Sequence, residues 1–294
     1  MKVLIYQVNV PQPWDKPANK PLPAYVEESV EGWRRYASTH GMDYSFESEP
    51  TFSPEEIPKD TDWRMQFYWS MALCKPELRH YDYIVHFDAD IIVKEGAPDI
   101  REELRGDFMA VRDPIDYMGL WNHHIIPLRK AFAFRNVSDH FGYPWYDHFN
   151  SGVWVSSPKA RELIWENWQQ DAFKSYEEKC LINTNSTGKY FNVGGKGTAF
   201  GLGDPYGGDQ NILNDIVHNS DLEFNSIDWR WNALSAGFKV NHIDEAHAIH
   251  YGGRVGKFLY AYPEYRRQLP LDHETVDFMN NCTSFERNEV KDKL

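Results

Sequence analysis

The sequence predicts an α/β fold built on a mixed, mostly parallel central sheet. Strand-like and helix-like hydrophobic patterns alternate through the first hundred residues, which is typical of a sheet covered by helices. Tyr83–Phe87 (YIVHF) is an apolar run between polar turns, as expected of a buried parallel strand. A chain of 294 residues is long enough for such a core, because surface scaling predicts that about three quarters of its surface is buried on folding.

The remaining elements are expected from their local patterns. Val3–Val10 is rich in Val, Ile and Tyr and predicts the first buried strand. Tyr25–His40 carries apolar residues at helical spacing, and Gly41 marks the end of that helix. Further strands are expected at Asp43–Glu47, Val153–Ser156, Phe238–Val240 and Ala248–Tyr251, and further helices between Thr61 and Pro76, over Pro158–Phe173 and over Asp209–Val217.

The domain organisation is expected to be simple. Residues 1–260 form one domain, and residues 261–294 form a polar, charged extension that packs on it or frays. The glycine-rich stretch Asn192–Gly208 is expected to be a loop.

Composition excludes some classes of function. The net charge of −13 argues against a broad nucleic-acid-binding face, because phosphate contacts need clustered Lys and Arg. Three cysteines, Cys74, Cys180 and Cys282, show neither metal-ligand spacing nor a disulfide framework, which favours free thiols in a reducing compartment. No signal peptide and no apolar stretch of membrane-spanning length is recognised, so the expected location is the cytoplasm.

Two carboxylates follow the apolar strand directly, in Asp88-Ala89-Asp90. Ligands of open α/β sheets bind beyond the carboxyl ends of the strands. On an extended chain, residues two apart point the same way, so both carboxylates are expected to reach one cation. Carboxylates suit Mn²⁺ or Mg²⁺, which can neutralise a diphosphate leaving group. The alternative is a pair of solvated acids at a strand end, and the metal interpretation is favoured over it.

Two further segments place small polar residues beside apolar ones. Phe149-Asn150-Ser151-Gly152-Val153 brings an amide and a hydroxyl that could bind sugar hydroxyls, and an ordinary strand-entry turn is an equally good interpretation. Asp209 and Gln210 open a helix after two glycines, where Asp209 is either a substrate ligand or a helix cap.

A late histidine completes the set. His250 ends a short strand and is followed by a glycine-rich turn that reaches Lys257. A neutral imidazole could be the third protein ligand of the metal, while backbone amides and Lys257 could hold phosphate. A lone histidine is more often structural, but the surrounding glycines and the lysine favour the functional interpretation.

In their order along the chain, these segments resemble the motifs of retaining, nucleotide-sugar-dependent glycosyltransferases of the GT-A fold, a Rossmann-like single domain. The resemblance is greatest to glycosyltransferase family 8. It covers roughly residues 1–257 and includes Trp231-Asn232. Residues Trp33–Tyr44 instead resemble a family of fungal and plant galactosyl- and xylosyltransferases, which is also retaining and GT-A.

The resemblance implies a role for each matched residue. Asp88, Asp90 and His250 would hold Mn²⁺ (or Mg²⁺) against the diphosphate of a nucleotide sugar, expected to be a UDP-sugar, and Asp88 would also contact the ribose. Gly253 would lie in the diphosphate-binding turn. Asp209 and Gln210 would be the catalytic pair, with Asp209 on the sugar hydroxyls and Gln210 on the face opposite the leaving group. The donor-binding set would be Asp88, Asn150, Ser151, Gly253, Lys257 and Arg64.

The sequence departs from the family 8 pattern at three places. The spacing from His250 to Lys257 is one residue longer, and Arg64 and Lys75 are the nearest candidates for a basic residue that does not align. Gln7-Val8-Asn9 replaces the usual Thr-Asp after the first strand.

The expected acceptor is a glycan, a glycolipid or a protein, and the aromatic segment Trp121–Tyr146 could form its binding face or simply pack in the core. One rival is a haloacid-dehalogenase-type phosphatase, with Asp88 as nucleophile, Asp90 as acid and Gly203-Asp204 with Asp209 at the metal. In that class the Asp-x-Asp motif follows the first strand, whereas here it follows a later one. Another rival is a non-catalytic carbohydrate-binding protein. Both leave part of the motif set unexplained.

Overall fold

The computed structural model describes residues 1–10, 22–49, 52, 69–112, 149–169, 208–235, 243–252 and 260–261. For residues 168, 169, 208, 209, 211 and 212 it describes the backbone alone. Within these ranges the strands form two sheets. The larger has the order β2-β1-β3-β6-β5-β7, and the smaller has the order β4-β9-β8.

The larger sheet confirms the predicted α/β class. Strands β1 and β2 and strands β1 and β3 pair in parallel, as do β5 and β7, whereas β6 runs antiparallel to both β3 and β5. Among the described pairings, the sheet is therefore mixed and mostly parallel. Its strands are β1 (Val3–Val8), β2 (Asp43–Glu47), β3 (Tyr83–Phe87), β5 (Phe108–Arg112), β6 (Phe149–Ser156) and β7 (Phe224–Ser226).

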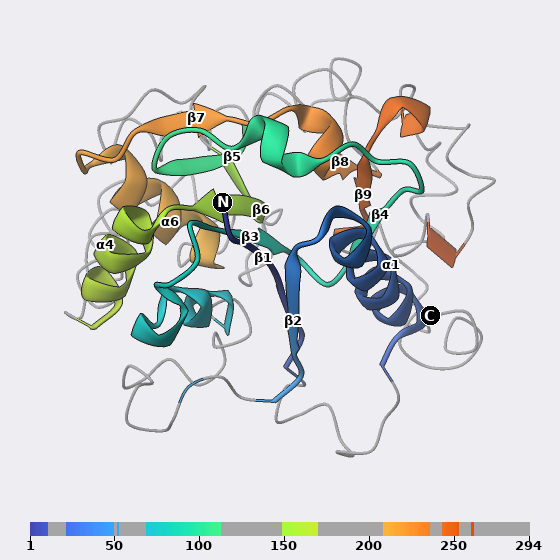
Figure 1. Cartoon of the computed structure of the whole chain (residues 1–294), viewed down its shortest axis with the longest axis horizontal. Coiled ribbons are helices and arrows are strands. Elements are labelled where there is room, and N and C mark those ends of the chain that lie inside the picture. The colour runs from blue at the N-terminus through green and yellow to red at the C-terminus, as the bar shows by residue number, and fades with distance from the viewer. Residues whose placement is uncertain are drawn as a thin grey trace, which may run out of the picture.

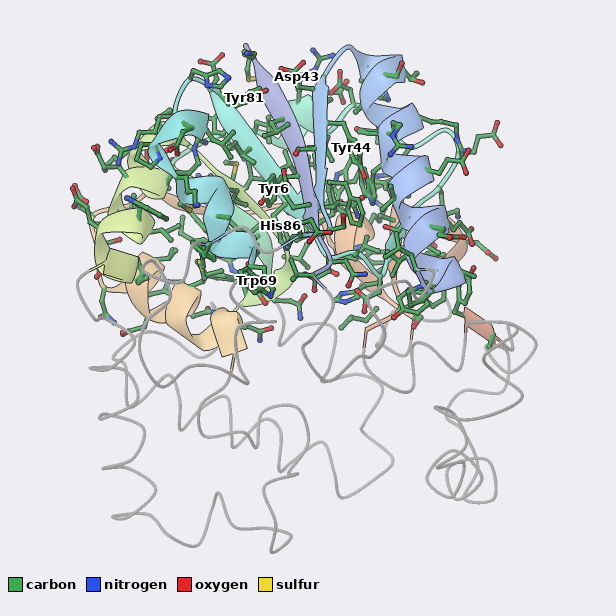
Figure 2. All side chains as sticks on the ribbon, turned by 90° about the horizontal axis from the view of Figure 1, so that it is seen from below. Tyr6, Asp43, Tyr44, Trp69, Tyr81 and His86 are labelled. Atoms are coloured by element: carbon green, nitrogen blue, oxygen red, sulfur yellow. The ribbon has the colours of Figure 1, made fainter. Side chains whose placement is uncertain are left out.

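Helices cover both faces of this sheet (Figures 1 and 2). Helix α1 (Ala24–His40) lies on one face, and α4 (Pro158–Gln169) and α6 (Gly208–His218) lie on the other, together with the 3₁₀ helix Trp69–Cys74. Because strand side chains alternate between faces, the core divides into two apolar clusters. Leu4, Tyr6, Ile84 and Trp154 face α4 and α6, while Val3, Ile5, Val85 and Val155 face Trp33 and Tyr36 of α1.

The end of α1 follows the sequence prediction. Gly41 adopts the left-handed conformation, with φ of 66°, and its N–H donates to carbonyls of the last turn. Glycine enters this region without the steric cost that a Cβ would add, which explains why the helix ends here.

Several elements differ from the prediction. The described part of the segment between Thr61 and Pro76 is the 3₁₀ helix Trp69–Cys74 rather than an α-helix. Strand β6 begins at Phe149, four residues before the predicted strand, and its pairing with β5 shifts register between Trp154 and Phe149, where the polar residues lie. Strands β4, β5, β7 and β8 were not predicted. Short 3₁₀ helices also occur at Pro76–Leu78, Ile100–Glu103 and Trp229–Asn232.

The smaller sheet brings distant parts of the chain together. Strand β4 (Ile91–Val93) pairs antiparallel with β9 (Ala248–His250), and β9 pairs in parallel with β8 (Ala233–Leu234). In this register Ile91 lies opposite His250. The residue that precedes β4, Asp90, is therefore brought to the end of β9.

Two sequence expectations concern the cysteine thiols and membrane-spanning segments. Cys74 is buried with a free thiol, and no described helix has the length and apolar character needed to span a membrane. The following lie outside the described residues: the predicted strand Phe238–Val240, Cys180 and Cys282, the aromatic segment Trp121–Tyr146, Asn192–Gly207 and the extension from residue 262.

Candidate metal centre and donor site

The two acids lie in a turn at the carboxyl end of β3. Ile91 N–H donates to the Asp88 carbonyl at 3.0 Å, which closes a four-residue turn over Asp88–Ile91. The expectation that both acids stand on extended backbone is therefore wrong. Their carboxylates approach each other because the chain turns there from the larger sheet into β4.

Buried polar side chains from β1 and α1 hold this turn. Gln7 Nε2 donates to the Asp88 carbonyl at 3.3 Å, and Ser29 Oγ and Trp33 Nε1 both donate to the Ile91 carbonyl, at 2.6 and 2.9 Å. Gln7 also donates to Ser29 and accepts from the Tyr44 hydroxyl at 2.9 Å. Burial raises the pKa of Tyr44, which keeps that hydroxyl protonated and donating. These contacts fix the backbone that carries the acids.

His250 meets the two acids from the smaller sheet. Its Nε2 lies 3.3 Å from Asp90 Oδ1 and 3.9 Å from Asp88 Oδ2. The Tyr251 N–H donates to the Asp90 carbonyl at 2.9 Å, which locks the end of β9 against the turn. One ligand atom from each of Asp88, Asp90 and His250 lies within 4.8 Å of the others. The three residues that were predicted to share a cation are thus adjacent.

This group fits a divalent cation. Neighbouring ligands of an octahedral ion at about 2.1 Å lie about 3 Å apart, close to the separation of His250 Nε2 and Asp90 Oδ1. Two carboxylates with one imidazole suit Mn²⁺ or Mg²⁺. The Asp88 side chain is 42% exposed, so a ligand from solvent can reach the site, whereas that of His250 is 7% exposed.

The sequence reasoning missed His86. Its Nε2 donates to Asp88 Oδ1 at 3.1 Å, which leaves Oδ2 facing His250. The ring packs against Tyr6 (Figure 2). It also packs against Trp154, which like Tyr6 belongs to the apolar cluster on the α4 side of the sheet. His86 is the second-last residue of β3 and Asp88 directly follows that strand, so their spacing of two residues was the available signal.

The predicted donor-binding residues Asn150 and Ser151 lie next to this turn. The Asp88 N–H donates to the Gly152 carbonyl at 2.8 Å, so the start of β6 borders the acids. Asn150 Oδ1 accepts from the Gly152 N–H at 2.9 Å and from Asn232 Nδ2 at 2.8 Å. Its Nδ2 donates to Gln210 Oε1 at 3.2 Å. The Asn150 oxygen is thus engaged within the protein.

Helix α6 is held against β6 by two side chains one turn apart. Asn214 accepts from the Phe149 N–H and donates to the Phe149 carbonyl, both at 3.0 Å, as a neighbouring strand would. Gln210 Oε1 accepts from the Ser151 N–H at 3.3 Å as well as from Asn150. The backbone of Asp209 lies in the first turn of this helix, and its side chain is outside the described residues.

Close packing surrounds the His250 ring. A Cβ at Gly152 would lie 2.6 Å from His250 Cε1, and a Cβ at Gly252 would lie 2.7 Å from Nε2. Both positions therefore need glycine for space, with neither residue in the left-handed region. His250 Nδ1 lies 2.8 Å from Asn232 Oδ1, and Asn232 is itself buried.

Other predicted residues lie outside the described ranges: Arg64, Gly253, Lys257 and the aromatic residues of the expected acceptor face. Lys75, the second candidate for the unaligned basic residue, places its ammonium 5.1 Å from the centre of the Phe52 ring.

No family model matches this chain, and no curated protein matches it in sequence. Among solved structures, it is similar to a glycosyltransferase involved in the glycosylation of the major capsid of PBCV-1, with 12% identity over 92% of this chain and 100% of that one and a TM-score of 0.47. It is also similar to the galactosyltransferase LgtC in complex with donor and acceptor sugar analogues, with 13% identity over 99% of this chain and 100% of that one and a TM-score of 0.44. A third similar structure is mouse xyloside xylosyltransferase 1, with 13% identity over 85% of this chain and 97% of that one and a TM-score of 0.39.

Proposed function

We propose that this chain is a metal-dependent glycosyltransferase that moves a sugar from a nucleotide-diphosphate sugar, expected to be a UDP-sugar, to an acceptor hydroxyl on a glycan, glycolipid or protein. The observation that carries the proposal is the convergence of Asp88, Asp90 and His250 from the ends of two sheets onto one partly buried point, which solvent reaches at Asp88. The motif order, which resembles family 8, supports the same activity.

The proposed metal is Mn²⁺ or Mg²⁺, held by Asp88 Oδ2, Asp90 Oδ1 and His250 Nε2. When bound, such an ion neutralises the charge that develops on a diphosphate leaving group. His86 holds the other Asp88 oxygen, so the carboxylate keeps one orientation as substrate arrives. Gln7, Ser29 and Trp33 keep the turn in place beneath it.

The proposed donor site lies along the start of β6. Ser151 and the second N–H of Asn150 Nδ2 are the groups we assign to the donor sugar, since the Asn150 oxygen already accepts two N–H groups. Gly253 and Lys257 are assigned to the diphosphate by the motif resemblance alone, and Arg64 is assigned to the donor as the nearest candidate for a basic residue that does not align.

The proposed stereochemical outcome is retention by front-side attack. In this reaction the acceptor hydroxyl attacks from the face that the diphosphate leaves, and a phosphate oxygen takes its proton. Gln210 Oε1 accepts two N–H groups from β6, which supports a role in positioning rather than as a nucleophile. Asp209, one residue earlier on α6, is assigned to the sugar hydroxyls.

A screen of sugar nucleotides tests the proposal and separates it from the rival functions. A transferase releases nucleoside diphosphate from one of them in the presence of Mn²⁺, and its melting temperature rises with that ligand. A phosphatase would release inorganic phosphate, and a carbohydrate-binding protein would release neither product. Asp90→Asn, which removes one ligand charge with little change of shape, should abolish the metal-dependent release while the fold is kept.

A further inference from the structure

A continuous chain of amide hydrogen bonds runs from the backbone of β6 to the inner nitrogen of His250. The Gly152 N–H donates to Asn150 Oδ1 at 2.9 Å, and Asn232 Nδ2 donates to the same oxygen at 2.8 Å. Asn232 Oδ1 lies 2.8 Å from His250 Nδ1. We call these three residues, Asn150, Asn232 and His250, the amide relay.

The backbone fixes the direction of every bond in the amide relay. A peptide N–H can only donate, so the Asn150 atom that faces Gly152 is its oxygen. The Asn232 atom that faces this oxygen must then be the nitrogen, which turns its oxygen toward His250. The contacts of Asn150 Nδ2 support the same orientation of the amide. This nitrogen donates to Gln210 Oε1, which is an acceptor because it also accepts from the Ser151 N–H.

It follows that His250 Nδ1 carries a proton whether the ring is neutral or charged. The neutral ring then has its lone pair on Nε2, the nitrogen 3.3 Å from Asp90 Oδ1. The other neutral tautomer would set a lone pair against the Asn232 oxygen and a hydrogen where a cation should bind. Histidines that ligate metals are commonly fixed in this way by a partner on the second nitrogen.

The surroundings of Asn232 suit such a role. Its side chain is buried at the end of the 3₁₀ turn Trp229–Asn232, which Asp228 caps by accepting from the Arg230 N–H at 2.9 Å. Gly152 and Gly252 both approach the His250 ring closely, which restricts its movement.

We propose that Asn232 is a positioning residue that holds His250 as the Nδ1–H tautomer, so that Nε2 is presented to the divalent cation together with Asp88 and Asp90. The part that concerns the cation rests on the proposed function. The part that concerns the tautomer does not.

Nitrogen-15 NMR of the metal-free protein tests the tautomer directly. Of the 12 histidines, His250 is assigned by the signals that His250→Gln removes. At a pH where the ring is neutral, Nδ1 should give the signal of a protonated nitrogen and Nε2 that of an unprotonated one. In Asn232→Leu, which removes the acceptor at similar size, the proton should move to Nε2, where Asp90 can accept it. A wild-type ring protonated on Nε2 overturns the proposal.

Asn232→Asp separates positioning from packing. Its carboxylate still accepts from Nδ1, but its second oxygen faces the Asn150 oxygen, so the variant should lose stability and keep the tautomer. Ser235→Ala is the matched control, because Ser235 is equally buried nearby and its hydroxyl has no hydrogen-bond partner in the described part of the chain. If Asn232→Asp shows the tautomer of Asn232→Leu, the proposal is wrong.

Calorimetric titration with MnCl₂ supplies the second measurement. Asn232→Leu should bind Mn²⁺ about 10–100-fold more weakly than the wild type, as expected for the loss of a partner behind a metal-bound histidine. Asn232→Asp and Ser235→Ala should stay within about threefold. A folded Asn232→Leu with wild-type affinity overturns the positioning role. A wild type that binds no Mn²⁺ overturns the proposed metal dependence instead, and NMR still decides the tautomer.

Discussion

Replacing Gly152 by alanine probes the packing that holds His250. The added Cβ would lie 2.6 Å from His250 Cε1 and 2.8 Å from Asn150 Oδ1. Ordinary contact for a Cβ begins at 3.4 Å, so the ring must shift by about 0.8 Å or the strand must yield. Overpacking of this kind costs about 1–3 kcal/mol of folding free energy.

The same shift should damage metal binding more than the fold. Metal–ligand distances vary by only about 0.2 Å around their usual values, so a ring displaced by several times that amount no longer places Nε2 on the cation. We expect Gly152→Ala to bind Mn²⁺ at least about tenfold more weakly in a calorimetric titration. Urea unfolding of the same preparation measures the loss of stability.

Gly41→Ala is the control for a general loss of stability. Gly41 has φ of 66° and no atom within 4 Å of an added Cβ, so alanine there strains the backbone far from the acids. It should cost about 1 kcal/mol and leave Mn²⁺ affinity unchanged. The reasoning fails if Gly152→Ala keeps wild-type stability and affinity, or if Gly41→Ala weakens Mn²⁺ binding equally.

Three further predictions address catalysis and stability. Asp209→Asn should lower kcat far more than it weakens calorimetric binding of the donor nucleotide; a variant that loses nucleotide binding alone contradicts this role. Burial alone would raise the pKa of Asp228, but the hydrogen bonds from Arg230 outweigh burial, and the pKa is lowered from its usual 3.8. The charge on Asp228 therefore stabilises the fold fully above pH 3.8, and this stabilisation is lost as the pH falls through the lowered pKa. Urea unfolding should therefore show wild type more stable than Asp228→Asn by about 0.5 kcal/mol at pH 7, with the difference vanishing at low pH, and a difference independent of pH would contradict it. Arg161 is buried, which lowers its pKa to about 10, and its Nη atoms donate to the carbonyls of Ser156 (2.6 Å) and Tyr81 (2.5 Å). Arg161→Met removes both donors, so it should lower the free energy of unfolding in urea by about 2–3 kcal/mol. A variant as stable as the wild type, or more stable, would contradict this.

Local patterns were sufficient to predict strands β1, β2 and β3 of the larger sheet, whereas β5 and β7 of the same sheet were not predicted. Val3–Val8 and Tyr83–Phe87 are apolar runs that contain β-branched residues, while Asp43–Glu47 alternates polar residues with the aromatic residues Tyr44 and Phe46. The smaller sheet could not be predicted in this way. Strands β4 and β8 have three and two residues, too few for a hydrophobic period. Both form by pairing with β9, which lies far from β4 along the chain.

The candidate metal ligands were predictable because their residue types carry the chemistry. Asp88, Asp90 and His250 were selected from the sequence, and the structure brings them together. The supporting roles of the residues around them were not predicted, because Asn150 and Asn232 were noted only as parts of motifs and Gln7 only as a departure from one. Gln7 contacts the Asp88 carbonyl across 81 residues and Asn232 contacts Asn150 across 82, so only the fold reveals their roles.

Crystals grown with MnCl₂ and a nucleoside diphosphate test the central claim most directly, through anomalous scattering measured at the manganese edge. The account predicts one strong peak at coordination distance from Asp88 Oδ2, Asp90 Oδ1 and His250 Nε2, bridged to the diphosphate. A well-ordered nucleotide bound elsewhere, or bound here with no manganese between it and these three side chains, would contradict it.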